Sequence, residues 1–199
     1  MILTALLLVI AQNPAQDPRY ERLDPETRAR VVAIVDSARL AGLPSEPLIH
    51  RALEGALKNA GRERIVIAVH RLAADLGTAR DALGTKATPP ELEAGVAALR
   101  AGATPAVLTR IRDVRRPPVT MALAVLADLV ASGVPADSAA AALLVLAPTA
   151  RDADLVEFRH AVERDIALGA PPAAATSVQL DAASVKVDAN ARNARPGKP

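Results

Sequence analysis

The chain has 199 residues and no cysteine, which excludes a disulfide framework, a thiol nucleophile and thiolate metal sites. Its aromatic residues are Tyr20 and Phe158, so a site that stacks nucleic-acid bases or sugar rings is disfavoured. The net charge is +2, and the positive excess lies near the C-terminus, at Lys186, Arg192, Arg195 and Lys198. Because this excess belongs to a tail and not to a folded face, the charge argues against nucleic acid as a partner.

Residues 2–11 form an apolar run of the length found in secretory signals, and the small residues Ala11 and Ala15 supply two cleavage positions. The run has about half of the roughly 20 residues needed to cross a membrane as a helix. We therefore expect a leader over residues 1–15 and a periplasmic or secreted protein, followed by a linker over residues 16–23. No Lys or Arg precedes the run, and the alternative is an ordinary buried N-terminal helix in a cytoplasmic protein.

Helix signals begin at Asp24, which precedes Pro25 as an N-cap and predicts a first helix that ends at Gly42. A second helix is expected to stop at Gly61, and a third, the longest, spans residues 62–83. Its apolar residues repeat in steps of four and three, the spacing of a helix packed lengthwise against neighbours. They are Ile65, Val69, Leu72, Leu76, Ala79 and Leu83.

Thr88 and Glu91 have the spacing of a capping box and predict the start of a fourth helix, which Gly102 closes. A fifth and a sixth helix are expected between residues 104 and 133, separated by Pro117 and Pro118. Residues 139–147 carry no charge, which is typical of a helix buried on all sides. A helix over 152–168 and a short last helix follow. From about residue 182 the apolar pattern gives way to polar residues, which predicts a disordered basic tail over 182–199.

One turn sequence recurs, a small residue followed by glycine, an apolar residue and proline. Glycine suits the left-handed position that ends a helix, and proline suits the start of the next. The glycines are Gly42, Gly102, Gly133 and Gly169. Their spacing is close to multiples of a helix-pair repeat of about 30 to 36 residues. The sequence therefore predicts an all-α domain over residues 24–181, with about eight to nine short helices. An irregular bundle and a short α-solenoid fit equally well.

Few residues have the spacing of a chemical site. His50 and Glu54 would share a helix face, which suits a metal-binding or general-base pair but is typical of a solvated pair. Glu157 and His160 form a single Glu-x-x-His motif, whereas di-iron bundles use two such pairs with further glutamates. We therefore assign no catalytic residue, no metal site and no cofactor.

A basic cluster marks the expected end of the fifth helix. Its members are Arg110, Arg112, Arg115 and Arg116. Cations at a helix C-terminus are favoured by the helix dipole, and the functional alternative is contact with a phosphate or an anionic lipid headgroup.

The leading hypothesis is a non-enzymatic, exported bacterial scaffold or protein-interaction module whose partner is another protein of the cell envelope. It depends on the repeat-like helices and on the lack of a recognisable catalytic motif. Two alternatives stay open. One is an exported hydrolase of cell-wall or peptide bonds that uses carboxylates with a nearby histidine. The other is a protein held on anionic lipid by its basic tail.

Overall fold

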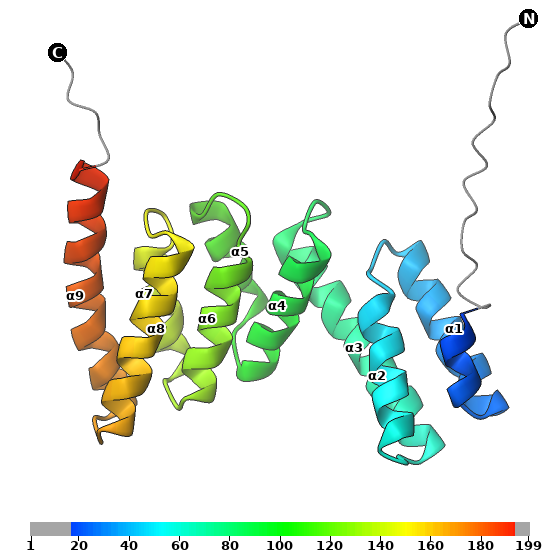
Figure 1. Cartoon of the computed structure of the whole chain (residues 1–199). Helices are drawn as coiled ribbons and strands as arrows, with labels where there is room; N and C mark the ends of the chain where they lie inside the picture. Colours follow the sequence, from blue (N-terminus) through cyan, green and yellow to red (C-terminus); the bar gives the residue numbers. More distant parts are fainter. Residues whose placement is uncertain (1–16, 194–199) are drawn as a thin grey trace, which may run out of the picture. The chain divides into compact units, whose positions relative to one another are not determined.

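The computed structural model describes residues 17–193, and within that range the chain is helical, with nine α-helices, one 3₁₀ helix and no strand (Figure 1). The all-α prediction is confirmed, whereas the predicted leader over 1–15 lies outside the described residues. The elements are η2 (Pro18–Arg22), α1 (Pro25–Leu40), α2 (Glu46–Leu57), α3 (Arg62–Leu83), α4 (Pro89–Ala101), α5 (Pro105–Val114), α6 (Thr120–Ala131), α7 (Ala136–Leu146), α8 (Asp152–Ala167) and α9 (Pro172–Asn193). The chain divides into two compact units, one up to Ala73 and one from Ala74 onward.

The recurring glycine turn has the predicted backbone. Gly42, Gly102, Gly133 and Gly169 have φ values of 74°, 118°, 93° and 99°. In each turn the residue after glycine donates its N–H to a carbonyl five residues earlier. Leu43 bonds to Ala38 at 2.9 Å and Val134 to Leu129 at 3.0 Å. Leu43 and Val134 are buried, so the apolar residue of the turn packs back onto the helix it ends.

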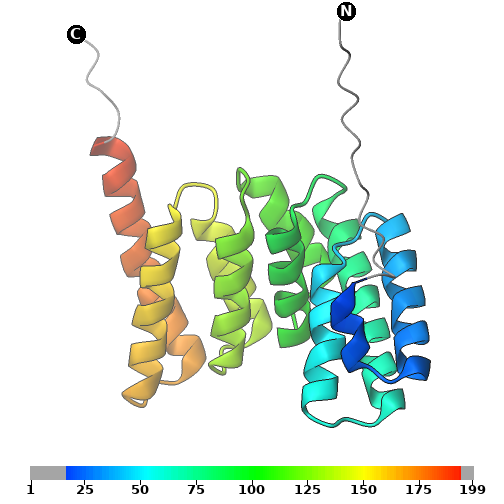
Figure 2. The ribbon, with the colours of Figure 1, turned by 45° about the vertical axis from the view of Figure 1, so that its right-hand side comes forward.

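In the first unit, η2 packs against both α1 and α2 (Figure 2). This corrects the predicted linker over residues 16–23. Asp17 caps the short helix through its side chain, and Tyr20 and Leu23 lie in the core at 1% and 3% exposure. Burial raises the pKa of Tyr20 to about 12. Two large apolar side chains within four residues give this segment enough buried surface to fold.

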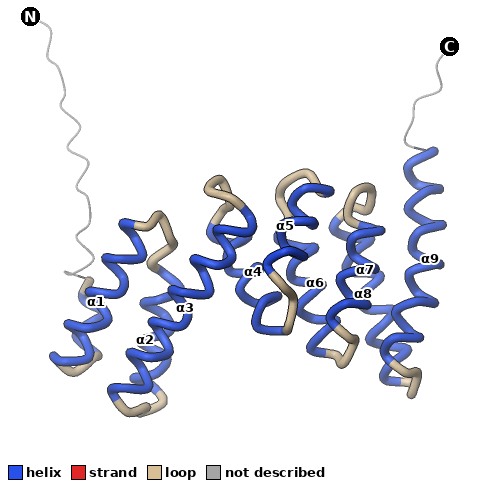
Figure 3. The backbone as a smooth tube through the Cα atoms, turned by 180° about the vertical axis from the view of Figure 1, so that it is seen from behind, coloured by secondary structure: helices blue, strands red, loops and turns tan. Residues whose placement is uncertain are grey.

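In the second unit the helices alternate between two rows, which can be followed in Figure 1 and from behind in Figure 3. One row contains α4, α6 and α8 in contact order, and the other contains α5, α7 and α9. Contacts of α6 with α5 and α7, and of α8 with α9, join the rows. The core between them is aliphatic, with fully buried Leu108, Leu123, Leu143 and Leu155.

Two predicted details of the helices are wrong. The second helix ends at Leu57 instead of near Gly61, and Asn59 takes the left-handed conformation with φ 52°. The uncharged stretch over residues 139–147, most of which lies in α7, is not buried on all sides, because Val145 is 56% exposed. Ala141 is exposed on the same face, so the lack of charge reflects small apolar residues at the surface and not full burial.

The C-terminal boundary also differs from the prediction. The last helix is not short and does not end near residue 182, because α9 continues to Asn193. Val187 is 4% exposed within the unit, and Lys186 forms an ion pair with Glu157 of α8 at 2.5 Å. Packing against α8 therefore orders a segment whose own sequence has a weak apolar pattern.

Candidate functional site

A cleft of about 650 Å³ lies in the second unit, between the loop that joins α3 to α4 and the loop that joins α5 to α6. We call it the loop cleft. Its lining residues are Leu83, Gly84, Thr85, Lys86, Ala87, Thr88, Glu91, Arg112, Pro117, Pro118 and Val119. Leu83 and Val119 are buried, whereas Thr85, Lys86, Pro117 and Pro118 are exposed. The cleft thus has an apolar floor and a rim open to solvent.

Local sequence explains the first wall of the loop cleft. Gly84, with φ 91°, ends α3, and a tight turn follows in which Ala87 donates its N–H to the Gly84 carbonyl at 3.1 Å. Thr88 then caps α4 as the sequence predicts, and the N–H of Thr88 donates to Oε2 of Glu91 at 2.8 Å. Turn and cap together fix the path of residues 84–88.

The second wall of the loop cleft, formed by the loop between α5 and α6, is held by Glu91 as well. Val119, which follows the two prolines, donates its N–H to Oε1 of Glu91 at 2.9 Å. The Thr88 hydroxyl donates to Oε2 at 2.8 Å, so the Glu91 carboxylate accepts three hydrogen bonds and ties both loops together. Glu91 is only 5% exposed. Burial raises its pKa, but the hydrogen bonds from Thr88 and Val119 outweigh burial, so the pKa lies below its ordinary value.

Two cations stand at the loop cleft. Arg112 donates from Nη1 to the carbonyl of Ala82, near the end of α3, at 2.8 Å, and its Nη2 pairs with Asp113 at 2.7 Å. Lys86 is exposed and makes no ion pair with any residue between 17 and 193 that the structure describes. The Ala82 carbonyl also accepts from the Thr109 hydroxyl at 3.1 Å, so α5 is fixed against the end of α3.

The predicted basic cluster is divided by the fold. Arg112 lines the loop cleft, whereas the guanidinium of Arg115 turns toward α7 and donates to the carbonyls of Ala147 and Ala150 at 3.0 and 2.7 Å. Arg115 also pairs with Asp152 at 2.5 Å and has 10% of its side chain exposed. Arg110 and Arg116 are exposed and form no ion pair with a described residue. The four arginines therefore do not form one anion site.

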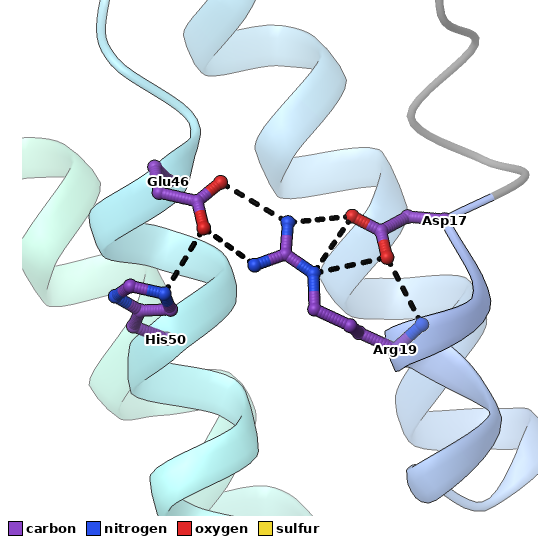
Figure 4. Close-up of polar contacts among 4 residues, drawn as sticks. All are labelled: Asp17, Arg19, Glu46 and His50. Atoms are coloured by element: carbon purple, nitrogen blue, oxygen red, sulfur yellow. Dashed lines mark hydrogen bonds and ion pairs between the residues drawn. The ribbon is translucent and has the colours of Figure 1, made fainter.

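The structure does not join His50 to Glu54. Figure 4 shows that Nε2 of His50 instead faces Glu46, at 3.0 Å from Oε1. Glu46 also binds Arg19 at 2.5 Å, and Arg19 pairs with Asp17 at 2.7 Å, so an ion network links η2 to α2. The hydrogen bonds of Arg19 lower the pKa of both carboxylates.

Glu54 pairs with Lys58 at 2.5 Å and with Arg51 at 2.9 Å, and these hydrogen bonds lower its pKa. Glu157 binds Lys186 on α9, and Nε2 of His160 lies 2.7 Å from Nη2 of Arg159. The remaining histidine, His70, is exposed on α3. The candidate carboxylates and histidines are thus engaged with other residues.

The described residues contain no group of three or more His, Cys, Asp or Glu side chains that could hold a metal ion. Among the helices between residues 17 and 193, none combines the length and the apolar character needed to cross a membrane. A scan against models of known protein families, a search of curated proteins and a search of solved structures each find no match.

Sequence reasoning missed the loop cleft, although two signals were present. The break around Gly84 and the Pro117-Pro118 break mark two loops at helix ends, and the local pattern of Thr88 and Glu91 indicates only a helix start. That Glu91 also binds Val119, 28 residues further along, is a tertiary contact without a local signature. Lys86 is a lone lysine in a turn, which gives no sequence signal of its own.

Proposed function

We propose that this protein is a non-enzymatic helical interaction module that works outside the cytoplasm and binds an extended segment of another protein in the loop cleft. The observation that carries the proposal is the cleft itself. Its volume of about 650 Å³ lies within the range of ligand-binding sites, about 300–1,000 Å³. An apolar floor with a few polar groups at the rim is also the composition of such sites.

The groups around the loop cleft favour binding over chemistry. The carboxylate of Glu91 already accepts three hydrogen bonds from the protein, and its lowered pKa makes it a poor proton carrier near neutral pH. The hydrolase hypothesis pairs a carboxylate such as Glu54 or Glu157 with a nearby histidine. His50 contacts Glu46 at the exposed surface instead of Glu54, and Glu157 binds Lys186 while His160 lies against Arg159, so neither of these pairs supports that alternative.

A segment of protein chain suits the loop cleft for a geometric reason. The two walls are loops, and their exposed rim residues leave the cleft open to a ligand that continues beyond it. An extended peptide can place one side chain on the floor at Leu83 and Val119 while its backbone runs along the rim. The walls are fixed by Glu91 before a ligand arrives, which reduces the entropy cost of binding.

The experiment that tests this function is site-specific photo-crosslinking in the organism that makes the protein. Thr85, at the rim of the loop cleft, is replaced by a photoreactive phenylalanine analogue, and the same replacement at Thr149 serves as the control. Thr149 is also an exposed loop threonine of the second unit but does not line the cleft. We expect a defined protein adduct from position 85 alone, lost when Ala87→Trp fills the cleft. Equal adducts from both positions contradict the proposal.

Export is a separate part of the proposal, and its support is the apolar run over residues 2–11. Mass spectrometry of the protein from the periplasmic and cytoplasmic fractions of a Gram-negative host tests it. We expect a mature N-terminus after Ala11 or Ala15 in the periplasmic fraction. An intact Met1 in the cytoplasm contradicts export and leaves the cleft proposal standing for a cytoplasmic partner.

The lipid-binding alternative depends on the segment from Lys186 onward. Lys186 is a helical residue that pairs with Glu157, and residues 194–199 lie outside the described part of the chain. Loss of liposome binding on deletion of residues 186–199 or on addition of salt is the outcome that would favour this alternative.

A further inference from the structure

At the loop cleft the negative charge is buried and the positive charges are accessible to a ligand. Glu91 is 5% exposed, and its carboxylate accepts three hydrogen bonds from the protein. Its negative charge is therefore largely compensated inside the cleft wall and not offered to a ligand. The cations stand further out. Lys86 is exposed, and 36% of the Arg112 side chain is accessible. A ligand that approaches the rim therefore meets positive charge first.

Donor groups at the rim also lack acceptors. Arg112 is partly neutralised by Asp113, but Lys86 forms no ion pair with any residue in the described part of the chain. The turn at residues 84–87 uses the N–H of Ala87, whereas the N–H groups of Thr85 and Lys86 have no hydrogen-bond acceptor among the described residues. This wall thus offers hydrogen-bond donors and a cation to a ligand that carries acceptors.

The apolar floor of the loop cleft favours a ligand that also carries an apolar group. Leu83 and Val119 are 5% and 3% exposed, and the two prolines of the second wall add apolar surface without an N–H donor. A free inorganic anion would leave this surface uncovered. A ligand that uses the whole cleft combines a negative charge at the Lys86 side with an apolar group on the floor.

We infer that the segment held in the loop cleft is acidic: a stretch of the partner protein that sets an Asp or Glu carboxylate against Lys86 and an apolar side chain on Leu83 and Val119. This inference rests on the proposed function and names its ligand class. The carboxylate accepts hydrogen bonds from Lys86 and from the free N–H groups of the turn, and the apolar side chain displaces water from the floor.

The test is a selection of short random displayed peptides on three immobilised full-length proteins: the wild type, Lys86→Glu and Arg110→Glu. Arg110→Glu is the matched control, because it makes the same change of charge on an exposed residue near the cleft. Arg110 lies two residues before Arg112 on α5, about 200° around the helix, and does not line the cleft. Enriched peptides are then measured in solution, with the cleft-filling Ala87→Trp protein as the competition control.

We expect the wild type and Arg110→Glu to enrich peptides with Asp or Glu beside Leu, Ile or Phe. Such a peptide should bind Lys86→Glu about tenfold more weakly, because reversal of one charge replaces an attraction with a repulsion. Neutral or basic peptides that are blocked by Ala87→Trp would overturn the acidic-ligand inference and leave the proposed function intact. If no peptide is enriched, or if Ala87→Trp does not block those that are, the proposed function fails as well.

Discussion

Glu46 in the first unit and Glu91 in the second each join separate elements, and the two carboxylates differ in their surroundings. In the first unit, Glu46 connects α2 to η2 through Arg19, and 54% of the Glu46 side chain is exposed. In the second unit, Glu91 connects two loops through backbone N–H groups and is 5% exposed. Water competes for the first set of contacts, whereas in the second set the bond from Val119 is buried and the bonds from Thr88 are partly buried.

The difference in burial between the Glu46 and Glu91 contacts indicates how firmly each one fixes the elements that it joins. An exposed ion pair between long side chains gains little free energy and adapts to several geometries. A buried backbone N–H group needs an acceptor, so the Glu91 carboxylate constrains where Val119 can lie, and the partly buried cap bond holds Thr88 to the same carboxylate. We therefore expect the loop cleft to keep one shape, whereas the Arg19 network stabilises a surface without defining a site.

The largest expected effect is that of Glu91→Ala. It removes the acceptor of two backbone N–H groups and should lower the free energy of unfolding by about 2 kcal/mol. Glu93→Ala is the matched control, because Glu93 lies on the same helix and is exposed. Urea denaturation of both variants measures the difference. Equal free energies of unfolding for Glu91→Ala and Glu93→Ala would contradict the expected difference between a buried and an exposed carboxylate.

A second prediction concerns pH. The pKa of Glu91 is lower in the folded protein than in the unfolded chain, so its ionised form contributes stability above the unfolded pKa. That contribution is lost as the pH falls through the folded-state pKa. The gap in unfolding free energy between the wild type and Glu91→Gln should therefore be full at neutral pH and should shrink in acid. A gap that grows on acidification contradicts this assignment.

A smaller effect is expected at two glycines inside helices. A Cβ atom built on Gly77 meets no atom within 4 Å, so Gly77→Ala should raise stability by about 0.5–1 kcal/mol. A Cβ on Gly55 would lie 2.8 Å from Cγ1 of the buried Ile65 and forces it to move. Gly55→Ala should therefore gain less than Gly77→Ala or lose stability. Thermal unfolding of the two variants makes this comparison.

The smallest effect is expected for Arg19→Ala. Its ion pairs with Asp17 and Glu46 lie at the surface, so the loss of stability should be well below that of Glu91→Ala and should vanish at high salt. Denaturation at low and high ionic strength tests this. A loss that salt does not reduce would show that the network in Figure 4 supports the fold of η2 more than its exposure suggests.

The helix caps and glycine turns could be predicted from the sequence, whereas the loop cleft could not. The left-handed glycines and the caps at Asp24 and Thr88 depend on neighbouring residues, so their patterns suffice. The contact between Glu91 and Val119 depends on how α4 and α6 pack. The order of α9 up to Asn193 likewise depends on α8, which no local pattern near residue 182 could indicate.

If the loop cleft of the second unit is where this protein binds its ligand, a bound peptide must change the surroundings of the residues that line it. Amide chemical shifts of the isotopically labelled full chain, recorded while a peptide from the selection is added, test it most directly. We expect saturable shifts concentrated in residues 83–91 and 112–119, with no change in residues 17–73. Shifts that leave both loops untouched and gather elsewhere in the chain would contradict it.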